Sequence, residues 1–391
     1  MNRKNVNSAR VPVYRDSGFE LKNAETTAGA FAEEGQHKRE PDIYIYSRYR
    51  NPTVVAAEEE VMKVEKCDWA LLTETGMAAV DTAVSVFQKG KSSEPWLFFT
   101  EIYGGTISFI DSILRKRRGL NIETFSPSDG RYDLDEFERV VKKLKPAIVY
   151  AETISNPLLV VADIPGVCAI ASRYGARVIV DNTFASPFLF RPLEHGASIV
   201  IHSATKYLSG HGNLTAGVIC GNDPEIMKEA IEYRKLTGHM ISPDDAYRLT
   251  SQILTFRLRF EQQCRNAEML AGLFSSSVIV SKVIYPDLAS HPTHDISARL
   301  FGSLLPGGML TIDFAGDDGQ EKRRRRDSFI ELVSGTIKLI PTLGDPHTIL
   351  MPVEAVWGAK YPEPGMIRIS AGFEESKELK KIVEDALNEV G

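Results

Sequence analysis

Cysteine is scarce in this chain of 391 residues, and the few thiols lie dozens of positions apart without a CxxC pair. Disulfide frameworks and zinc sites both need cysteines at recurring short separations, so the sequence predicts neither. No group of His, Cys and Asp has metal-ligand spacing, and we therefore expect no metal. The thiols are predicted to be core residues, and they are Cys67, Cys168, Cys220 and Cys264.

Long apolar runs are also missing. No stretch approaches the roughly 18 apolar residues of a membrane span. The polar segment Met1 to Arg10 has no apolar run of signal-peptide length. We predict a cytoplasmic protein that has no membrane partner.

A large net charge of one sign is absent too, because 46 Lys and Arg against 52 Asp and Glu give 46 − 52 = −6. Proteins that coat nucleic acid or anionic membranes favour a strongly basic face, so we expect no nucleic-acid partner. The basic run Arg323 to Arg326 is flanked by acids and is predicted to be the solvated start of a helix. A small anionic ligand remains compatible with this charge, because it needs only a local positive site.

What the chain does contain is a globular composition, with 43% hydrophobic residues, and a regular alternation of patterns. Short apolar runs predict buried strands, and amphipathic stretches between them predict helices. One helix carries Val80 and is predicted to stop at Gly90, and another opens at Asp133 and stops before Pro146. This alternation predicts an α/β fold with a doubly wound, mostly parallel sheet. The predicted strands are Trp69–Thr73, Trp96–Thr100, Ala147–Glu152, Arg177–Asn182, Ala197–His202 and Ala216–Cys220.

The two ends of the chain differ from this central part. Up to Asn51 the sequence has little periodicity, which predicts an extended arm of the kind that docks on a neighbouring subunit. Asn51 as N-cap and Pro52 then begin a helix that runs to about Lys66. We predict one long helix over 244–271 and, after it, strands Met309–Phe314 and Met366–Ser370. The predicted organisation is an arm over 1–55, a ligand-binding domain over 56–243, and a smaller C-terminal α+β domain over 244–391.

Ligands of such sheets bind at the carboxyl ends of the strands, so the loops that follow the strands are the candidate sites. Gly76 opens a helix whose first amides can bind an anion without a charged side chain. Tyr103 offers a ring for stacking, and Asn156 offers an amide. Each loop taken alone is explained as well, or better, by ordinary turn chemistry.

Two further strand ends favour a ligand site over ordinary turn chemistry. One ends in the carboxylate of Asp181, and the next ends in Ser203-Ala204-Thr205-Lys206-Tyr207. A lysine, a carboxylate, an aromatic ring and anion donors at one sheet edge are the parts that a pyridoxal phosphate site needs. The phosphate-loop motifs G-x-G-x-x-G and GxxxxGK[ST] are absent, which argues against a dinucleotide or a nucleoside triphosphate.

These segments closely resemble the signature of the Cys/Met-metabolism pyridoxal-phosphate enzymes, which include cystathionine γ-synthase, cystathionine γ-lyase, methionine γ-lyase and O-acylhomoserine sulfhydrylase. The resemblance covers roughly residues 40 to 375 and implies the pyridoxal-phosphate transferase fold called fold type I. The matching segments are residues 46–53, 75–79, 103–106, 155–157, 180–187, 203–211 and 367–374.

The resemblance implies a role for each matching residue. Lys206 and Tyr103 are the catalytic candidates: Lys206 would form the Schiff base and move protons, and Tyr103 would stack on the cofactor ring. Arg368, Thr342 and Tyr46 would bind substrate, with Arg368 on its α-carboxylate. The implied cofactor ligands are Lys206, Asp181 at the ring nitrogen, Asn156 near the ring hydroxyl, Tyr103, Thr183, and the phosphate ligands Gly76, Met77, Ser203, Thr205, Tyr46 and Arg48.

The resemblance also implies an assembly. Tyr46 and Arg48 match a pair that in the family reaches the phosphate of the neighbouring subunit, and we expect a homotetramer built from dimers that share active sites. The small-molecule partners would be amino acids.

Departures from the family bear on the reaction. Gly105 stands where methionine γ-lyases carry a cysteine, and Met351 stands roughly where cystathionine γ-lyases have a glutamate. The family's histidine-containing stretch is replaced by 352–357, and Gln252-Ile253-Leu254-Thr255 replaces a Gly-Leu-Lys-Thr pattern. We favour γ-replacement on an activated homoserine ester with a thiol. The alternatives are a cystathionine or methionine γ-lyase, a fold type I aminotransferase, and a catalytically silent ligand-binding relative.

Overall fold

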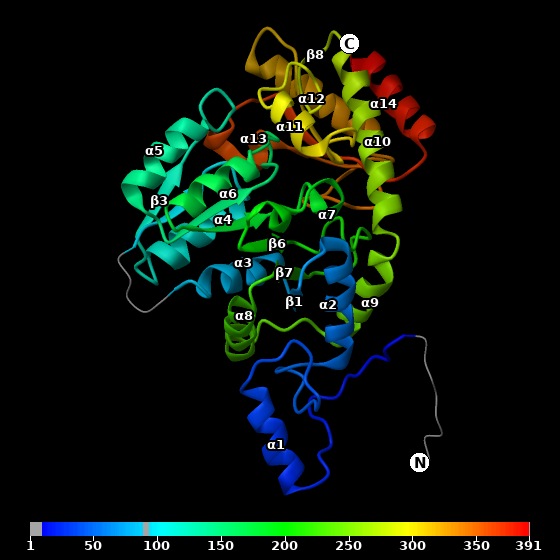
Figure 1. The fold of residues 1–391 in the computed structure, drawn as a ribbon. Coiled ribbons are helices and arrows are strands. Elements are labelled where there is room, and N and C mark those ends of the chain that lie inside the picture. The colour runs from blue at the N-terminus through cyan, green and yellow to red at the C-terminus, as the bar shows by residue number, and fades with distance from the viewer. Residues whose placement is uncertain (1–9, 89–93, 391) are drawn as a thin grey trace.

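The computed structural model describes residues 10–88 and 94–390, and it contains two β-sheets whose strands are linked by helices (Figure 1). The predicted helix stop at Gly90 lies outside the described residues. The first sheet has seven strands in the order β1-β7-β6-β5-β4-β2-β3. Their bounds are β1 Trp69–Thr73, β2 Trp96–Phe99, β3 Ile122–Phe125, β4 Ile148–Glu152, β5 Arg177–Asp181, β6 Ile199–His202 and β7 Gly217–Gly221.

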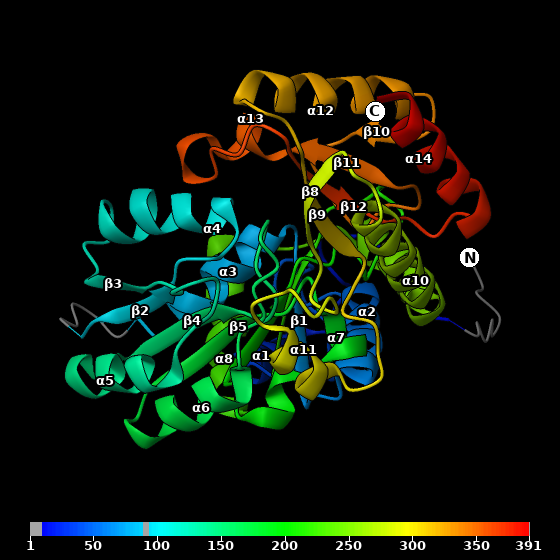
Figure 2. The same cartoon turned by 90° about the horizontal axis from the view of Figure 1, so that it is seen from above.

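This sheet is mostly parallel, as predicted. Strands β6, β5, β4, β2 and β3 pair in parallel, whereas β7 runs antiparallel to both β6 and β1. Helices cover both of its faces, with α3 and α4 on one side and α5 and α6 on the other (Figure 2). The helices of this part are α3 Gly76–Ser85, α4 Gly104–Phe109, the π-helical η1 Ile110–Arg115, α5 Leu134–Leu144, α6 Ile164–Arg173, α7 Ser186–Leu189, η2 Pro192–His195 and α8 Pro224–Thr237.

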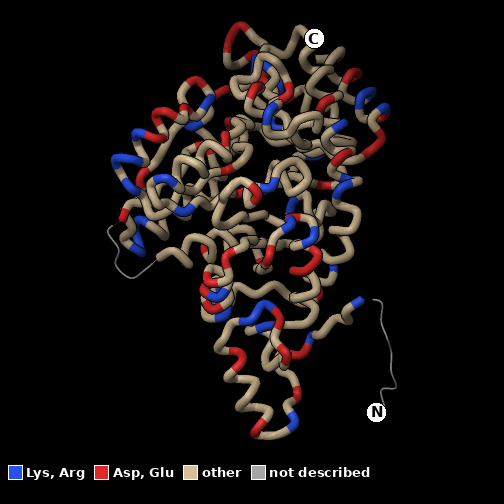
Figure 3. Tube along the Cα trace, viewed as in Figure 1, with Lys and Arg blue, Asp and Glu red and all other residues tan. Residues whose placement is uncertain are grey.

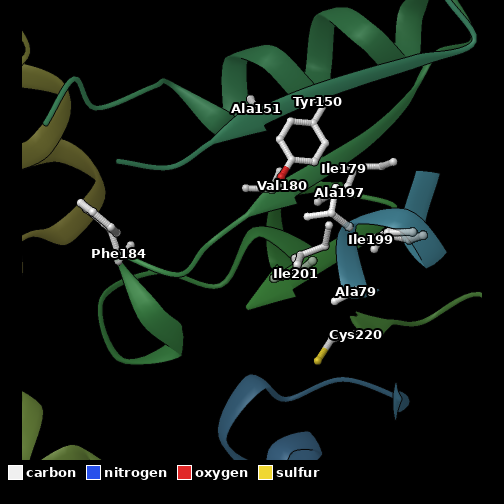
Figure 4. Close-up of a cluster of buried hydrophobic side chains, with 14 of the residues drawn as sticks. Ala79, Tyr150, Ala151, Ile179, Val180, Phe184, Ala197, Ile199, Ile201 and Cys220 are labelled. Atoms are coloured by element: carbon white, nitrogen blue, oxygen red, sulfur yellow. The ribbon is translucent and has the colours of Figure 1, made fainter. Parts of the chain in front are cut away.

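All six predicted strands of this part are present, with bounds that differ by two residues at most. Their apolar residues form a continuous core, in which side chains of β4, β5 and β6 meet Ala79 of α3 (Figure 4). The four cysteines are buried and unpaired, which confirms that they are core residues. Strand β3 was missed, because the two central residues of this short edge strand, Glu123 and Thr124, are exposed and interrupt the apolar run.

The predicted long helix over 244–271 is wrong: it is two helices, α9 (Pro243–Ile253) and α10 (Phe256–Ser275). The break frees the carbonyl of Gln252, which accepts hydrogen bonds from Thr255 Oγ1 at 3.2 Å and from Arg259 Nη2 at 2.9 Å. Arg259 is buried and needs such acceptors. The need of the buried Arg259 for hydrogen-bond acceptors therefore accounts for a break between two segments that both have helical sequence patterns.

The second sheet has five strands in the order β10-β11-β12-β9-β8, and α10, α12 and α14 cover one of its faces (Figure 2). The predicted strands Met309–Phe314 (β9) and Met366–Ser370 (β12) have the bounds expected. The remaining elements are β8 Val280–Ile284, α11 His294–Phe301, α12 Gly319–Val333, β10 Lys338–Leu339, β11 Ile349–Pro352, α13 Val353–Trp357, η3 Gly358–Lys360 and α14 Ser376–Val390.

The basic run in α12 is not a fully solvated helix start, contrary to the prediction. Arg326 is only 9% exposed, and its Nη1 donates to the carbonyl of Pro364 at 2.7 Å. Arg323 forms an ion pair with Glu354 of α13. Along the outside of the molecule, basic and acidic segments are interspersed, in keeping with the small net charge (Figure 3).

The N-terminal arm projects away from the two sheets (Figure 1). It contains a helix that was not predicted, α1 (Ala24–Glu34), whose N-cap Asn23 accepts from the amide of Thr26. Adjacent threonines and Gly29 are poor helix formers, which hid this helix in the sequence. Helix α2 (Pro52–Glu65) begins as predicted, because Asn51 Oδ1 accepts from the amide of Thr53 at 2.9 Å. None of the described helices is long and apolar enough to cross a membrane.

Candidate active site

A cavity of about 610 Å³ lies where the carboxyl ends of the first sheet's strands meet the second sheet. Its volume is within the range of pockets that hold a cofactor or drug-sized ligand. Most of the predicted site residues line it together, although they come from seven separate loops and strands. These residues are Gly76, Met77, Tyr103, Asn156, Asp181, Thr183, Ser203, Thr205, Lys206, Thr342 and Arg368.

Lys206 is the only lysine that lines this cavity in the described chain. Its Nζ donates to Thr342 Oγ1 at 2.6 Å, so an amine from the first sheet's loops meets a hydroxyl that precedes β11. Burial, together with the positive charge of Arg368, lowers the pKa of this amine to about 8. At pH 7 about a tenth of Lys206 is therefore the neutral, nucleophilic amine, which is far more than for a lysine of ordinary pKa.

Asp181 ends β5 and faces the same cavity. Its Oδ1 accepts from the backbone amide of Thr183 at 3.0 Å and from the hydroxyl of Thr183 at 2.6 Å. Desolvation raises the pKa of the Asp181 carboxyl, and the bonds from Thr183 oppose that rise. A cationic ring nitrogen beside this carboxylate would favour its ionised form. Thr183 thus orients Asp181 through its own side chain and backbone.

The loop that opens α3 comes unusually close to the loop that follows β6. A Cβ atom on Gly76 would lie 3.0 Å from Ser203 Cβ and Oγ, so glycine is what permits this approach. Thr75 caps the helix by accepting from the amide of Ala78, and the amides of Gly76 and Met77 precede that bond. Helix N-termini of this kind bind anions. The hydroxyl of Thr205 is already bonded to the carbonyl of Ala216, so it would have to turn to contribute.

Arg368 lies on β12 and is buried at the far side of the cavity. Its Nη1 donates to Asn156 Oδ1 at 3.1 Å, and its Nη2 donates to the carbonyl of Thr342 at 2.7 Å. Its Nε is buried without a hydrogen-bond partner, and burial lowers the pKa of the guanidinium to about 10. An unpartnered buried donor beside a cavity is suited to a ligand carboxylate.

Glu152 also lines the cavity, and sequence reasoning missed its contribution. It ends β4 directly opposite Asp181 of β5, and its Oε1 accepts from the amide of Tyr103 at 2.5 Å. Burial and the nearby Asp181 charge raise the pKa of Glu152 well above its usual value. The sequence signal that could have identified Glu152 is its place as an acid at the end of a predicted strand. Glu152 fixes the backbone of the loop that presents the half-exposed Tyr103 ring.

Tyr46 and Arg48 do not line this cavity. They lie on the arm, where the Arg48 guanidinium sits 5.4 Å from the Tyr46 ring centroid and 5.1 Å from that of Tyr49. Arg48 Nη1 donates to the carbonyl of Lys235 at the end of α8. Within one chain, these two predicted residues are therefore separate from the other eleven.

A family model described as Cys/Met metabolism PLP-dependent enzyme matches residues 1–388. The chain belongs to this family. Among the curated relatives of this chain, the L-methionine gamma-lyase of Porphyromonas gingivalis is 32% identical to it, and the match covers 94% of this chain and 90% of the relative. The cystathionine beta-lyase of Lactococcus lactis subsp. cremoris (strain MG1363) is also 32% identical, with 98% and 95% covered.

Solved structures share the fold of this chain. The metB structure from Corynebacterium glutamicum has a TM-score of 0.84 and 29% identity, and the match covers 98% of this chain and 94% of that one. A cystathionine gamma synthase from Xanthomonas oryzae pv. oryzae has a TM-score of 0.83 and 24% identity, with 97% and 93% covered, and shows the shared fold. The Cys/Met metabolism family is PLP-dependent, and the predicted fold type I architecture and cofactor are confirmed.

The residues present fit pyridoxal phosphate. The cavity offers an amine of lowered pKa, a carboxylate held by Thr183, and a glycine-dependent approach between the loops that carry Gly76 and Ser203. These groups come from the ends of β1, β5 and β6, yet all line one cavity. This is the donor set that the chemistry of the cofactor requires.

Proposed function

We propose that this enzyme replaces the γ-substituent of an activated homoserine ester with a thiol. The observation that carries the proposal is the placement of Lys206 beside Thr342 and Arg368 in one cavity. When bound, pyridoxal phosphate supplies the electron sink that makes the α-proton of an amino acid acidic.

The chain's own residues would bind the substrate and move its protons. Arg368 would hold the α-carboxylate through Nε and the edge of its guanidinium. Lys206, with its pKa of about 8, would accept the α-proton, would have to pass that proton on to become a base again, and would then accept a β-proton, after which the γ-substituent can depart with its bonding electrons. Asp181 would hold a proton on the ring nitrogen, and Glu152 would keep the Tyr103 loop in place.

Gly105 supports replacement over elimination of methionine. Methionine γ-lyases carry a cysteine at this place, whereas here a Cβ atom would lie 2.4 Å from Cε1 of the Tyr103 ring. The Tyr103 ring therefore occupies the space that a side chain at position 105 would need. The second candidate is γ-elimination to a thiol, a 2-oxo acid and ammonia, and the name of the methionine gamma-lyase of Porphyromonas gingivalis favours it.

A substrate panel separates these reactions. O-acetylhomoserine and O-succinylhomoserine would be incubated with sulfide, methanethiol or cysteine, alongside methionine and cystathionine alone, and the products identified by mass spectrometry. Our proposal expects a new thioether or thiol product that depends on the added thiol. Rapid release of 2-oxobutyrate without any thiol would instead assign a lyase. Lys206→Ala should abolish both products, which controls for chemistry by free cofactor.

A further inference from the structure

Arg368, the proposed carboxylate ligand, is surrounded by apolar side chains on the side that faces the cavity. Met351 of β11 lies directly opposite Arg368 of β12, so the two side chains share one face of the second sheet. The Trp357 ring centroid is 5.6 Å from Arg368 Cζ. We name the four cavity-lining residues of this side the apolar wall, and they are Leu343, Met351, Val356 and Trp357.

Each charged side chain that lines the cavity already has a hydrogen-bond partner within the site. Among the described residues that line it, the charged side chains are Glu152, Asp181, Lys206 and Arg368. Glu152 accepts from Tyr103, Asp181 accepts from Thr183, Lys206 donates to Thr342, and Arg368 donates to Asn156. Within one chain, none of these charged side chains belongs to the side of the cavity formed by Leu343, Met351, Val356 and Trp357.

The apolar wall is held in place from both ends. Glu354, at the start of α13, pairs with Arg323 and Arg326 of α12. Beyond α13, the Tyr361 hydroxyl donates to Glu101, and Lys360 Nζ lies 3.4 Å from the Glu101 carboxylate. Glu101 is two residues before Tyr103. The basic run of α12 thus helps to fix a segment that faces the ligand cavity.

We propose that the enzyme selects amino acids whose side chain ends in an uncharged, apolar group. This inference rests on the proposed function, because it takes Arg368 as the ligand of the α-carboxylate. A side chain directed at the apolar wall loses its hydration, and an unpaired charge there is strongly disfavoured. The preferred substrates are therefore O-acetylhomoserine or methionine, rather than O-succinylhomoserine or cystathionine.

Binding of two matched ligands tests this inference without any γ-chemistry. L-norleucine and L-2-aminoadipate have side chains of the same length that end in a methyl and a carboxylate, and neither has a leaving group. Binding to the holoenzyme is followed by the visible absorbance of the bound cofactor. We expect L-norleucine to bind at least ten-fold more tightly. Equal or tighter binding of L-2-aminoadipate overturns the inference.

Two lysine substitutions test whether the apolar wall causes this selectivity. Val356 lines the cavity and is 52% exposed, so Val356→Lys is expected to fold and to bring L-2-aminoadipate within about three-fold of L-norleucine. Leu339→Lys is the matched control, because Leu339 is 55% exposed on β10 and does not line the cavity. It should keep the wild-type ratio. An unchanged ratio in Val356→Lys, or an equal change in Leu339→Lys, overturns the inference.

The outcome is distinguishable from failure of the proposed function. If L-norleucine binds preferentially but no homoserine ester, methionine or cystathionine is turned over, the proposed function fails and the selectivity stands. If γ-replacement occurs with a higher kcat/KM for O-succinylhomoserine than for O-acetylhomoserine, the proposed function stands and the selectivity fails.

Discussion

At the scale of single residues, Lys206 combines a partly buried position with a neighbouring positive charge. Both effects disfavour its protonated form, and burial is the larger one. The neutral amine is the nucleophile that attaches pyridoxal phosphate, so its availability should follow this pKa.

The pH dependence of cofactor attachment checks this assignment. For the wild-type apoenzyme, the attachment rate should rise with pH and reach half its maximum at about pH 8. Arg368→Gln removes the charge that favours the neutral amine, so the midpoint should move to higher pH. Arg368→Lys keeps the charge and should stay near the wild-type midpoint. A midpoint that falls in Arg368→Gln would contradict the assignment.

Gly76 offers a second test at the residue scale. In Gly76→Ala the new methyl group would meet Ser203 at 3.0 Å, which forces the two loops apart at a cost of about 1–3 kcal/mol. Pyridoxal phosphate should therefore bind the apoenzyme roughly ten-fold or more weakly. Gly29→Ala is the control, because a Cβ at this exposed position in α1 meets nothing within 4 Å. It should leave cofactor affinity unchanged and raise unfolding stability by about 0.5–1 kcal/mol.

At the scale of elements, one buried carboxylate joins the arm to the first sheet. Glu58 of α2 forms ion pairs with Arg50 at 2.6 Å and with Arg234 of α8 at 3.0 Å, and it accepts from the amide of Leu72 in β1. All three charged side chains are buried. The arm that carries Tyr46 and Arg48 is therefore tied to the ligand-binding part of the chain.

Neutralising Glu58 should leave two buried arginines without their anion. We expect Glu58→Gln to lower the free energy of unfolding by about 3–5 kcal/mol, measured by urea denaturation. The control on the same helix is Glu60→Gln, whose partner Lys63 is 67% exposed. This control should change stability by less than about 0.5 kcal/mol. Comparable losses in the two variants would show that burial does not set the effect.

The elements that could be predicted from sequence are those that carry their own local signal. Apolar runs predicted six of the seven strands of the first sheet, and Asn51 followed by Pro52 predicted the start of α2. The break before α10 depends on Arg259 reaching back to Gln252, and the partial burial of the α12 arginines depends on Glu354. Such requirements arise only when distant segments pack. Glu152 was missed for the same reason, because its partner Tyr103 lies on another loop.

At the scale of the whole molecule, the separation of Tyr46 and Arg48 from the cavity within one chain bears on assembly. The arm projects from the body (Figure 1), and both residues lie on it between α1 and α2. We propose that a second copy supplies Tyr46 and Arg48 to the site, which is the arrangement that the predicted homotetramer of dimers requires. Its mass in solution would be four times the 43.4 kDa of the chain.

Mixed assemblies of two inactive variants test this arrangement. Lys206→Ala and Arg48→Ala would each impair every site of their own homo-oligomer, because each site needs Lys206 from one chain and Arg48 from its neighbour. In a hybrid dimer, one site collects both defects and the other has neither. Random exchange makes half of the dimers hybrids, each with one of two sites intact, so about a quarter of wild-type activity should return on co-refolding. If Arg48 served its own chain's site, every site of the mixture would carry a defect and no activity would return.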